Sequence, residues 1–151
     1  MRTQQTNQAD AYQTLLVIWF SLLISQFLFL ALVYFIKPGL LQFNFTKPIV
    51  DDDAIVVAAI GFVALTDLLI SFVMKKKYLD QAVREQKVGL VQTAMIVGCA
   101  LCESVSLFGL LLAFAFDYPY FWVLCALGII GTLFHFPNKK YVEAAGFKAV
   151  L

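Results

Sequence analysis

The sequence predicts an all-α fold, an integral membrane bundle of four transmembrane helices, and three observations lead to that prediction. Hydrophobic residues make up 62% of the 151 residues and charged residues only 14%, whereas soluble domains are about half apolar and a quarter charged. The apolar residues form long runs of the length that a bilayer-crossing helix needs. The basic residues gather almost entirely in alternate connections between these runs, as in multi-pass membrane proteins. The connections are short, so we expect one transmembrane domain over 1–151.

The first helix is expected over about 14–36. The segment Lys37-Pro38-Gly39 ends it, because proline removes a backbone donor and glycine turns easily. The apolar run is too long for the core of a signal peptide, and no small-x-small cleavage site follows it. The sequence therefore predicts an uncleaved first helix.

The second helix is expected over about 54–74, and Lys75-Lys76-Lys77 follows it. The triplet Asp51-Asp52-Asp53 precedes it, where acidic side chains suit the positive end of the helix dipole. A calcium site is the alternative interpretation, but the triplet lacks the spaced ligands and glycine of a calcium loop. The charged, amphipathic segment 78–87 is expected to prolong the helix beyond the lipid.

The third helix is expected over about 88–116 and the fourth over about 120–136. The very short turn between them, Asp117-Tyr118-Pro119, predicts that they are antiparallel neighbours. In the short cytoplasmic tail, 137–151, we expect one or two helical turns at the membrane surface. His135, just before it, is interpreted as an interfacial anchor.

The eleven Lys and Arg residues divide unevenly between the two sides of the predicted membrane. Nine lie on one side: Arg2, Lys75, Lys76, Lys77, Arg84, Lys87, Lys139, Lys140 and Lys148. The other two are Lys37 and Lys47. The positive-inside rule then predicts a multi-pass protein of the bacterial inner (plasma) membrane with both termini in the cytoplasm. The cluster Lys75, Lys76, Lys77, Arg84 and Lys87 is predicted to lie at the membrane surface, where it could attract anionic lipid headgroups.

Glu103 stands near the centre of the third predicted helix, where a carboxylate is costly and needs a partner or a function. In one interpretation it cycles between protonated and ionised forms and carries a proton or sodium ion. In the other it stays protonated, because burial disfavours its charge, and hydrogen-bonds a neighbouring helix. Candidate partners are Gln26 and Ser25 on the first helix, which are expected at a depth in the membrane comparable to that of Glu103. The candidate residues for ion binding or helix pairing are Glu103, Asp67, Gln26, Gln92, Ser104 and Ser106.

Asp67 is expected roughly 12 Å of helix from the boundary at Lys75, which is shallower than Glu103. Direct contact between the two carboxyls is therefore not expected, and Gln92 and Thr93 match Asp67 better in depth. We favour a polar contact between the second and third helices over a proton path from Asp67 to Glu103.

Small residues recur every four positions along the third helix, a spacing that lets helices approach closely in lipid. The candidate packing residues are Gly98, Cys102, Gly109 and Ala113, with Ser106 in the same row. This pattern predicts an interior or interface helix. Cys99 and Cys102 form a CxxC, but they stand in an apolar run without a second pair, which does not favour metal or redox chemistry.

The chain carries no nucleophile, phosphate-loop or metal-site motif, so we expect no enzyme, catalytic residue, cofactor or metal. A net charge of +1 gives no reason to expect a nucleic acid. The favoured function is that of a non-enzymatic subunit or assembly partner in a membrane complex, as a homo- or hetero-oligomer in the lipid bilayer. The alternative is a protein that handles protons or sodium ions through Glu103.

One family resemblance bears on these alternatives. The run 93–114, TAMIVGCALCESVSLFGLLLAF, resembles the carboxylate-bearing outer helix of the F-type ATP synthase c subunit. The matching residues are Ala100, Leu101, Glu103, Leu107, Phe108, Gly109 and Leu110, and Arg84-Glu85-Gln86 is similar to the polar loop before that helix. The resemblance implies that Glu103 binds an ion and that Arg84 belongs to the polar loop.

The chain departs from that family elsewhere. Gly61 stands alone where the family has a glycine repeat, no proline follows Gln86, and four spans are predicted in place of two. A rotor ring of this chain is therefore not expected. As a whole, the sequence is similar to a family of uncharacterised bacterial four-span membrane proteins.

Overall fold

The computed structural model describes residues 2–41 and 54–146, and these form α-helices and one short 3₁₀ helix without strands. The elements are α1 (Arg2–Ile36), η1 (Pro38–Leu41), α2 (Ala54–Glu85), α3 (Val88–Ala115), α4 (Phe121–Phe134) and α5 (Lys139–Gly146). The predicted all-helical fold is confirmed for these residues. The triplet 51–53, which we expected to cap the second helix, lies outside the described residues.

Three helices are long and apolar enough to cross a membrane: α1 from Asp10 to Ile36, α2 and α3. The fourth candidate span passes this test only as the pair α4 and α5, which are bent by 46° at the break between them. With 14 residues, α4 is shorter than the expected 120–136 and rises only about 21 Å. The sequence pattern therefore yields three helices of spanning length, or four if the bent pair counts as one.

Helices α1 and α2 extend beyond the predicted spans. α1 begins at Arg2 rather than near residue 14, and α2 continues past its lysines to Glu85, in agreement with the expected extension over 78–87. Gln86 then takes a left-handed conformation with φ of 51°, and the N–H of Lys87 returns to the carbonyl of Ala82 at 3.1 Å. This closure turns the chain sharply into α3.

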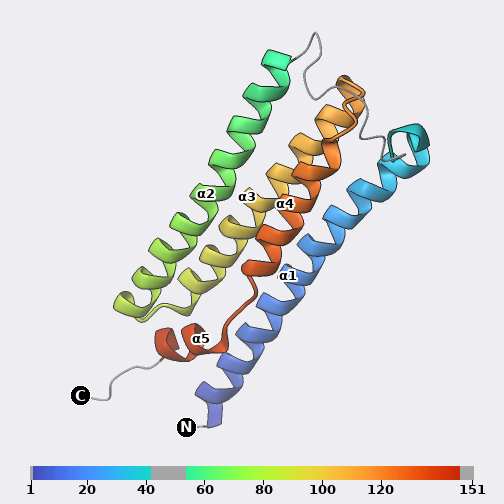
Figure 1. Ribbon diagram of the computed structural model, residues 1–151. Helices are drawn as coiled ribbons and strands as arrows, with labels where there is room; N and C mark the ends of the chain where they lie inside the picture. Colours follow the sequence, from blue (N-terminus) through green and yellow to red (C-terminus); the bar gives the residue numbers. More distant parts are fainter. Residues whose placement is uncertain (1, 42–53, 147–151) are drawn as a thin grey trace.

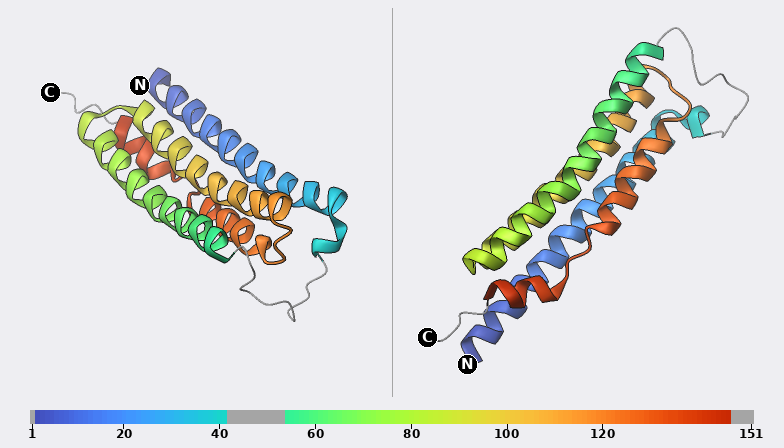
Figure 2. Two further views of the ribbon diagram at one scale, coloured as in Figure 1. Left: turned by 90° about the horizontal axis from the view of Figure 1, so that it is seen from above. Right: turned by 60° about the vertical axis from the view of Figure 1, so that its left-hand side comes forward.

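α3 lies at the centre of the bundle, with α1 and α2 on either side of it, and contacts α1, α2, α4 and α5 (Figures 1 and 2). α4 runs back antiparallel along α3, as the short connection predicts, and α5 closes the end at which α2 turns into α3 (Figure 1). The expectation that the third helix is interior is confirmed, since it has by far the most buried residues among the described helices.

Two apolar clusters fill the two ends of the bundle. One includes Leu15, Leu79, Met95 and Val142, near α5, and the other is built around Val105 and its neighbours towards the α3–α4 turn. The buried polar side chains of the described residues are Gln26, Ser71, Ser106, Thr132 and His135. A polar layer across the bundle therefore separates the two clusters.

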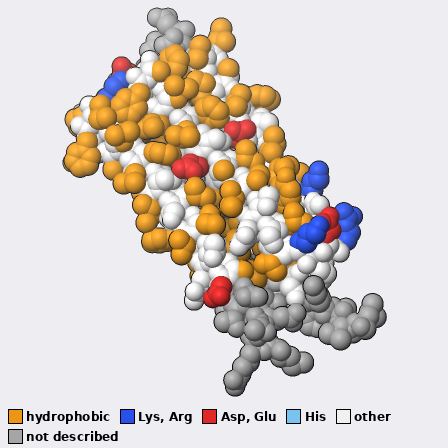
Figure 3. Space-filling view, turned by 180° about the vertical axis from the view of Figure 1, so that it is seen from behind, with side chains coloured by type: hydrophobic (Ala, Val, Ile, Leu, Met, Phe, Trp, Pro, Cys, Tyr) orange, Lys and Arg blue, Asp and Glu red, His pale blue; other side chains and the backbone are white. Residues whose placement is uncertain are grey.

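The outer surface is dominated by large apolar side chains, as expected for contact with lipid. On the face opposite the view of Figure 1, acidic side chains lie among apolar ones midway along the bundle, while Lys and Arg side chains lie near the ends (Figure 3).

Candidate functional site

The candidate site is built on α3, where the small residues of the four-residue row let neighbouring helices approach. Gly98, Cys102, Gly109 and Ala113 are all buried. A Cβ added at Gly109 would lie 2.8 Å from the carbonyl oxygen of Phe121 on α4, so only glycine fits this approach. The row is a packing surface of this chain's own bundle.

Glu103 on α3 contacts α1 through Ser25, one of its two expected partners. The Ser25 hydroxyl lies 2.5 Å from Oε1 of Glu103 and 2.8 Å from the carbonyl oxygen of Leu22. The Glu103 side chain is only partly buried within this chain, although the sequence places it at the centre of an apolar helix. The hydrogen bond thus anchors a carboxyl group that stays open to the outside of the single chain.

Gln26, the other expected partner of Glu103, makes different contacts. Its amide nitrogen donates to the Thr132 hydroxyl at 2.6 Å, and its amide oxygen accepts from the Ser106 hydroxyl at 3.0 Å. The indole N–H of Trp19 donates to the Thr132 carbonyl at 2.8 Å. Gln26, Ser106 and Thr132 are fully buried and join α1, α3 and α4, while Trp19 is partly buried. Gln26 is turned about 100° around α1 from Ser25, so it reaches different partners.

Asp67 on α2 contacts α3, as favoured from the sequence, but through Ser104. The Ser104 hydroxyl lies 2.9 Å from Oδ2 of Asp67 and 2.7 Å from the carbonyl oxygen of Leu101. Gln92, an expected depth match, is partly exposed and makes no side-chain hydrogen bond within the part of the chain that the structure describes. Asp67 and Glu103 are likewise not bonded to each other. Ser104 and Glu103 are adjacent, so one turn of α3 is hydrogen-bonded to α2 through Ser104 and to α1 through Glu103.

His135 is fully buried rather than placed at the interface as an anchor. Its Nδ1 lies 2.7 Å from the carbonyl oxygen of Gly131, its Nε2 lies 3.4 Å from that of Ser71, and its ring packs against Phe72 at 4.8 Å. Gly98 makes room for this ring, since a Cβ there would lie 2.7 Å from Nε2. The ring therefore joins α2, α3 and the end of α4.

The basic residues predicted for the membrane surface are spread over the end of the bundle where α2 turns into α3. Lys75 is half-buried and donates to the carbonyl oxygen of Phe134 at 3.1 Å, while Lys87 pairs with Glu85 at 2.9 Å. Lys76, Lys77 and Arg84 are exposed. Lys75 thus ties α2 to the end of α4, a contact that the sequence did not predict.

Sequence reasoning missed the α4 half of this polar layer. Gly128 and Thr132 are four residues apart, which is the same small-residue signal that marks α3. Gly131 on the same helix is closely packed against α3, since a Cβ there would lie 2.8 Å from the Cys102 sulfur. Ser71 is the remaining member and receives a hydrogen bond from the Cys102 thiol at 3.5 Å. This spacing in α4 was the signal that could have revealed the layer.

The chemistry available at the site is that of carboxyl, hydroxyl, amide and imidazole groups in an apolar surrounding. Within residues 2–41 and 54–146, no group of three or more His, Cys, Asp and Glu side chains is arranged to hold a metal ion. Such groups can join helices by hydrogen bonds or exchange a proton.

Comparisons with protein-family models, with curated proteins and with solved structures found no match to this chain. The likeness of α3 to the c-subunit helix therefore stays a prediction.

Proposed function

We propose that this chain is a non-enzymatic, multi-pass membrane protein that acts as a subunit or assembly partner in a membrane complex, and that Glu103 and Asp67 mark the surface where a partner packs. The observation that carries the proposal is the position of these two carboxyls. Each is held by a serine of a neighbouring helix, and each remains partly exposed midway along an apolar surface. Carboxyls facing lipid are costly, and a second subunit over this surface removes that cost.

Counting hydrogens favours neutral carboxyls at both positions. Ser25 and Ser104 each have one hydroxyl hydrogen, yet each hydroxyl lies within bonding distance of two oxygens, a carboxyl oxygen and a backbone carbonyl. If the carboxyl is protonated and donates to the serine, the serine can donate to the carbonyl and both contacts are satisfied. A neutral carboxyl also suits the surrounding hydrocarbon, and its remaining lone pairs can accept a hydrogen bond from a partner helix.

The charge distribution supports the proposed orientation, with both termini in the cytoplasm. The N-terminal end of α1, the α2–α3 turn and α5 lie at one end of the bundle (Figure 1), and the basic residues 75–77, 84, 87, 139 and 140 belong to that end. Lys37 lies at the opposite end, where it pairs with Asp117 at 2.6 Å. The positive-inside rule assigns the basic end to the cytoplasm.

Proton or sodium handling through Glu103 is the second candidate, and the resemblance of α3 to the c-subunit helix favours it. It requires a carboxyl that exchanges its ion, whereas helix pairing requires only a hydrogen bond. The two functions therefore differ in which side chains can replace Glu103 without loss of function.

Substitution separates the two candidates. We expect the complex extracted from membranes in mild detergent to keep its size in Glu103→Gln, because an amide still bonds, and to dissociate in Glu103→Leu. Asp80→Asn, an exposed acid beyond the apolar part of α2, is the matched control and should change nothing. A wild-type chain that is monomeric under all mild conditions would refute the assembly role.

Labelling with a hydrophobic carbodiimide, located by mass spectrometry, tests the same carboxyls directly. We expect Glu103 to be protected in intact membranes and to react once the complex is dissociated. Reaction in intact membranes that titrates with pH, or that sodium blocks, would replace the assembly role by ion handling.

A further inference from the structure

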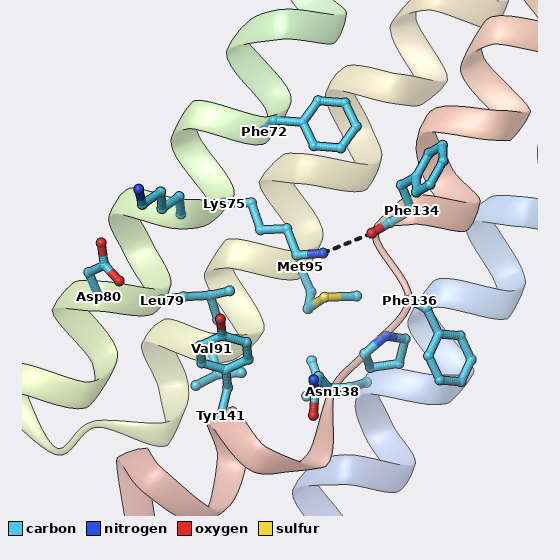
Figure 4. Close-up of a pocket in the computed structure, with 13 residues that line it drawn as sticks. Phe72, Lys75, Leu79, Asp80, Val91, Met95, Phe134, Phe136, Asn138 and Tyr141 are labelled. Carbon is cyan, nitrogen blue, oxygen red and sulfur yellow. Dashed lines mark hydrogen bonds between the residues drawn. The ribbon is translucent and has the colours of Figure 1, made fainter.

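A pocket of about 320 Å³ opens at the basic end of the bundle, between α2, α3, the start of α5 and the chain that joins α4 to α5 (Figure 4). It falls within the usual size range of small-molecule sites. Its wall has a basic side, made by Lys75 and Lys76, and an apolar side that includes Phe72, Met95 and Phe136.

The basic side of the pocket offers positive charge without a carboxylate partner. Ion pairs of the described residues involve Lys37, Lys87 and Lys139, and neither Lys75 nor Lys76 takes part in one. The Lys75 ammonium has three hydrogens and donates one to the Phe134 carbonyl (Figure 4). The remaining hydrogens can bind an anion. Asp80 also lines the pocket, as an exposed carboxylate.

The apolar side continues onto the outer surface of the bundle. Phe134 is 70% exposed, Phe136 51% and Phe72 41%, and all three line the pocket. The lysines follow directly on the apolar part of α2, which is the level of lipid headgroups for a helix that spans the bilayer. An occupant must therefore combine an anionic group with a hydrocarbon chain at the membrane surface.

We propose that this pocket binds an anionic phospholipid of the bilayer. Its phosphate is held by Lys75 and Lys76, and the adjoining part of one acyl chain lies against Phe72, Phe134 and Phe136. A soluble anion would find the same ammonium groups but would gain nothing from the apolar wall. This site is independent of the carboxyl surface of the proposed function, so either can fail without the other.

The test is native mass spectrometry of the full-length protein, titrated in detergent with phosphatidylglycerol, phosphatidylcholine or inorganic phosphate. We expect phosphatidylglycerol to bind with preference over phosphatidylcholine, and inorganic phosphate not to displace it. The double variant Lys75→Gln/Lys76→Gln should bind phosphatidylglycerol at least about tenfold more weakly, since each basic residue near an anionic lipid contributes a several-fold effect. Lys139→Gln/Lys140→Gln removes two charges from the same end outside the pocket and should change binding less than twofold, roughly.

Two further variants separate lost binding from lost folding. Lys75→Arg/Lys76→Arg keeps both charges and should retain binding. Asn138→Trp places bulk at the pocket wall without a change in charge and should weaken binding. Equal binding of the two lipids, displacement by inorganic phosphate, or equal losses in the two lysine-to-glutamine double variants would overturn the proposal.

Discussion

Gly128 is the position at which the close approach of α3 and α4 can be tested most directly. A Cβ at this residue would lie 2.6 Å from the carbonyl oxygen of Cys102 and 3.1 Å from the backbone nitrogen of Ser106. These are backbone atoms of α3, so Gly128→Ala forces the helices apart instead of turning a side chain aside. Overpacking of this kind costs about 1–3 kcal/mol.

Two smaller terms modify that cost. The added methyl displaces the Ser106 hydroxyl, whose hydrogen bond to Gln26 is worth about 0.6 kcal/mol by comparison with other membrane helices. Alanine in place of glycine stabilises the helix by about 1 kcal/mol, because alanine has the higher helix propensity. The net expected loss is about 0.5–2.5 kcal/mol, or roughly two- to seventy-fold in the unfolding equilibrium constant.

The assay is unfolding of the purified chain by SDS in mixed micelles, followed by circular dichroism. Gly61→Ala is the matched control, because nothing lies within 4 Å of a Cβ there and the same gain in propensity applies. We expect Gly61→Ala to be neutral or stabilising and Gly128→Ala to be destabilising. If Gly128→Ala is as stable as Gly61→Ala, the close packing of α3 against α4 described above is refuted.

Three further predictions concern other parts of the bundle. Gln26→Leu should lower the free energy of unfolding by about 1–2 kcal/mol in the same SDS assay, because the hydroxyl of Thr132 loses its buried partner; an unchanged stability would contradict the network. Lys37→Gln should cost about 0.5–1 kcal/mol, since the Lys37 ammonium bonds the last carbonyls of α3, and its effect should shrink in high salt. With both termini cytoplasmic, Asn138→Cys should react with a membrane-impermeant maleimide only in inside-out vesicles and Gly39→Cys only in right-side-out ones; the reverse pattern would overturn the orientation.

Hydropathy and charge were sufficient to predict the helices, because in lipid every backbone group must be bonded within its own segment. The same signals did not locate the ends of α1 and α4. A helix can continue through polar residues, as α1 does back to Arg2, and no apolar pattern marks such an extension. At the bend after Phe134, the Lys75 ammonium bonds the Phe134 carbonyl, a contact that no local sequence pattern marks.

Depth along a helix can be counted from a sequence, but rotation about the helix axis cannot be fixed without its neighbours. Ser25 and Gln26 were equivalent partners for Glu103 by depth, and only the packing of α1 on α3 decides which one faces it. The same limit hid the contact between Asp67 and Ser104. His135 was misplaced for a related reason, since the space left by Gly98 for its ring arises only when two helices meet.

The central position of α3 has a consequence for how the protein is made. Helices leave the ribosome in chain order, and α1 and α2 pack on opposite sides of α3 rather than extensively on each other. The partners of Ser25, Gln26 and Asp67 on other helices all lie on α3 and α4. Until α3 and α4 have followed, these polar groups of α1 and α2 therefore lack the partners that they have in the folded chain. α3 is thus the element on which the helices before it assemble.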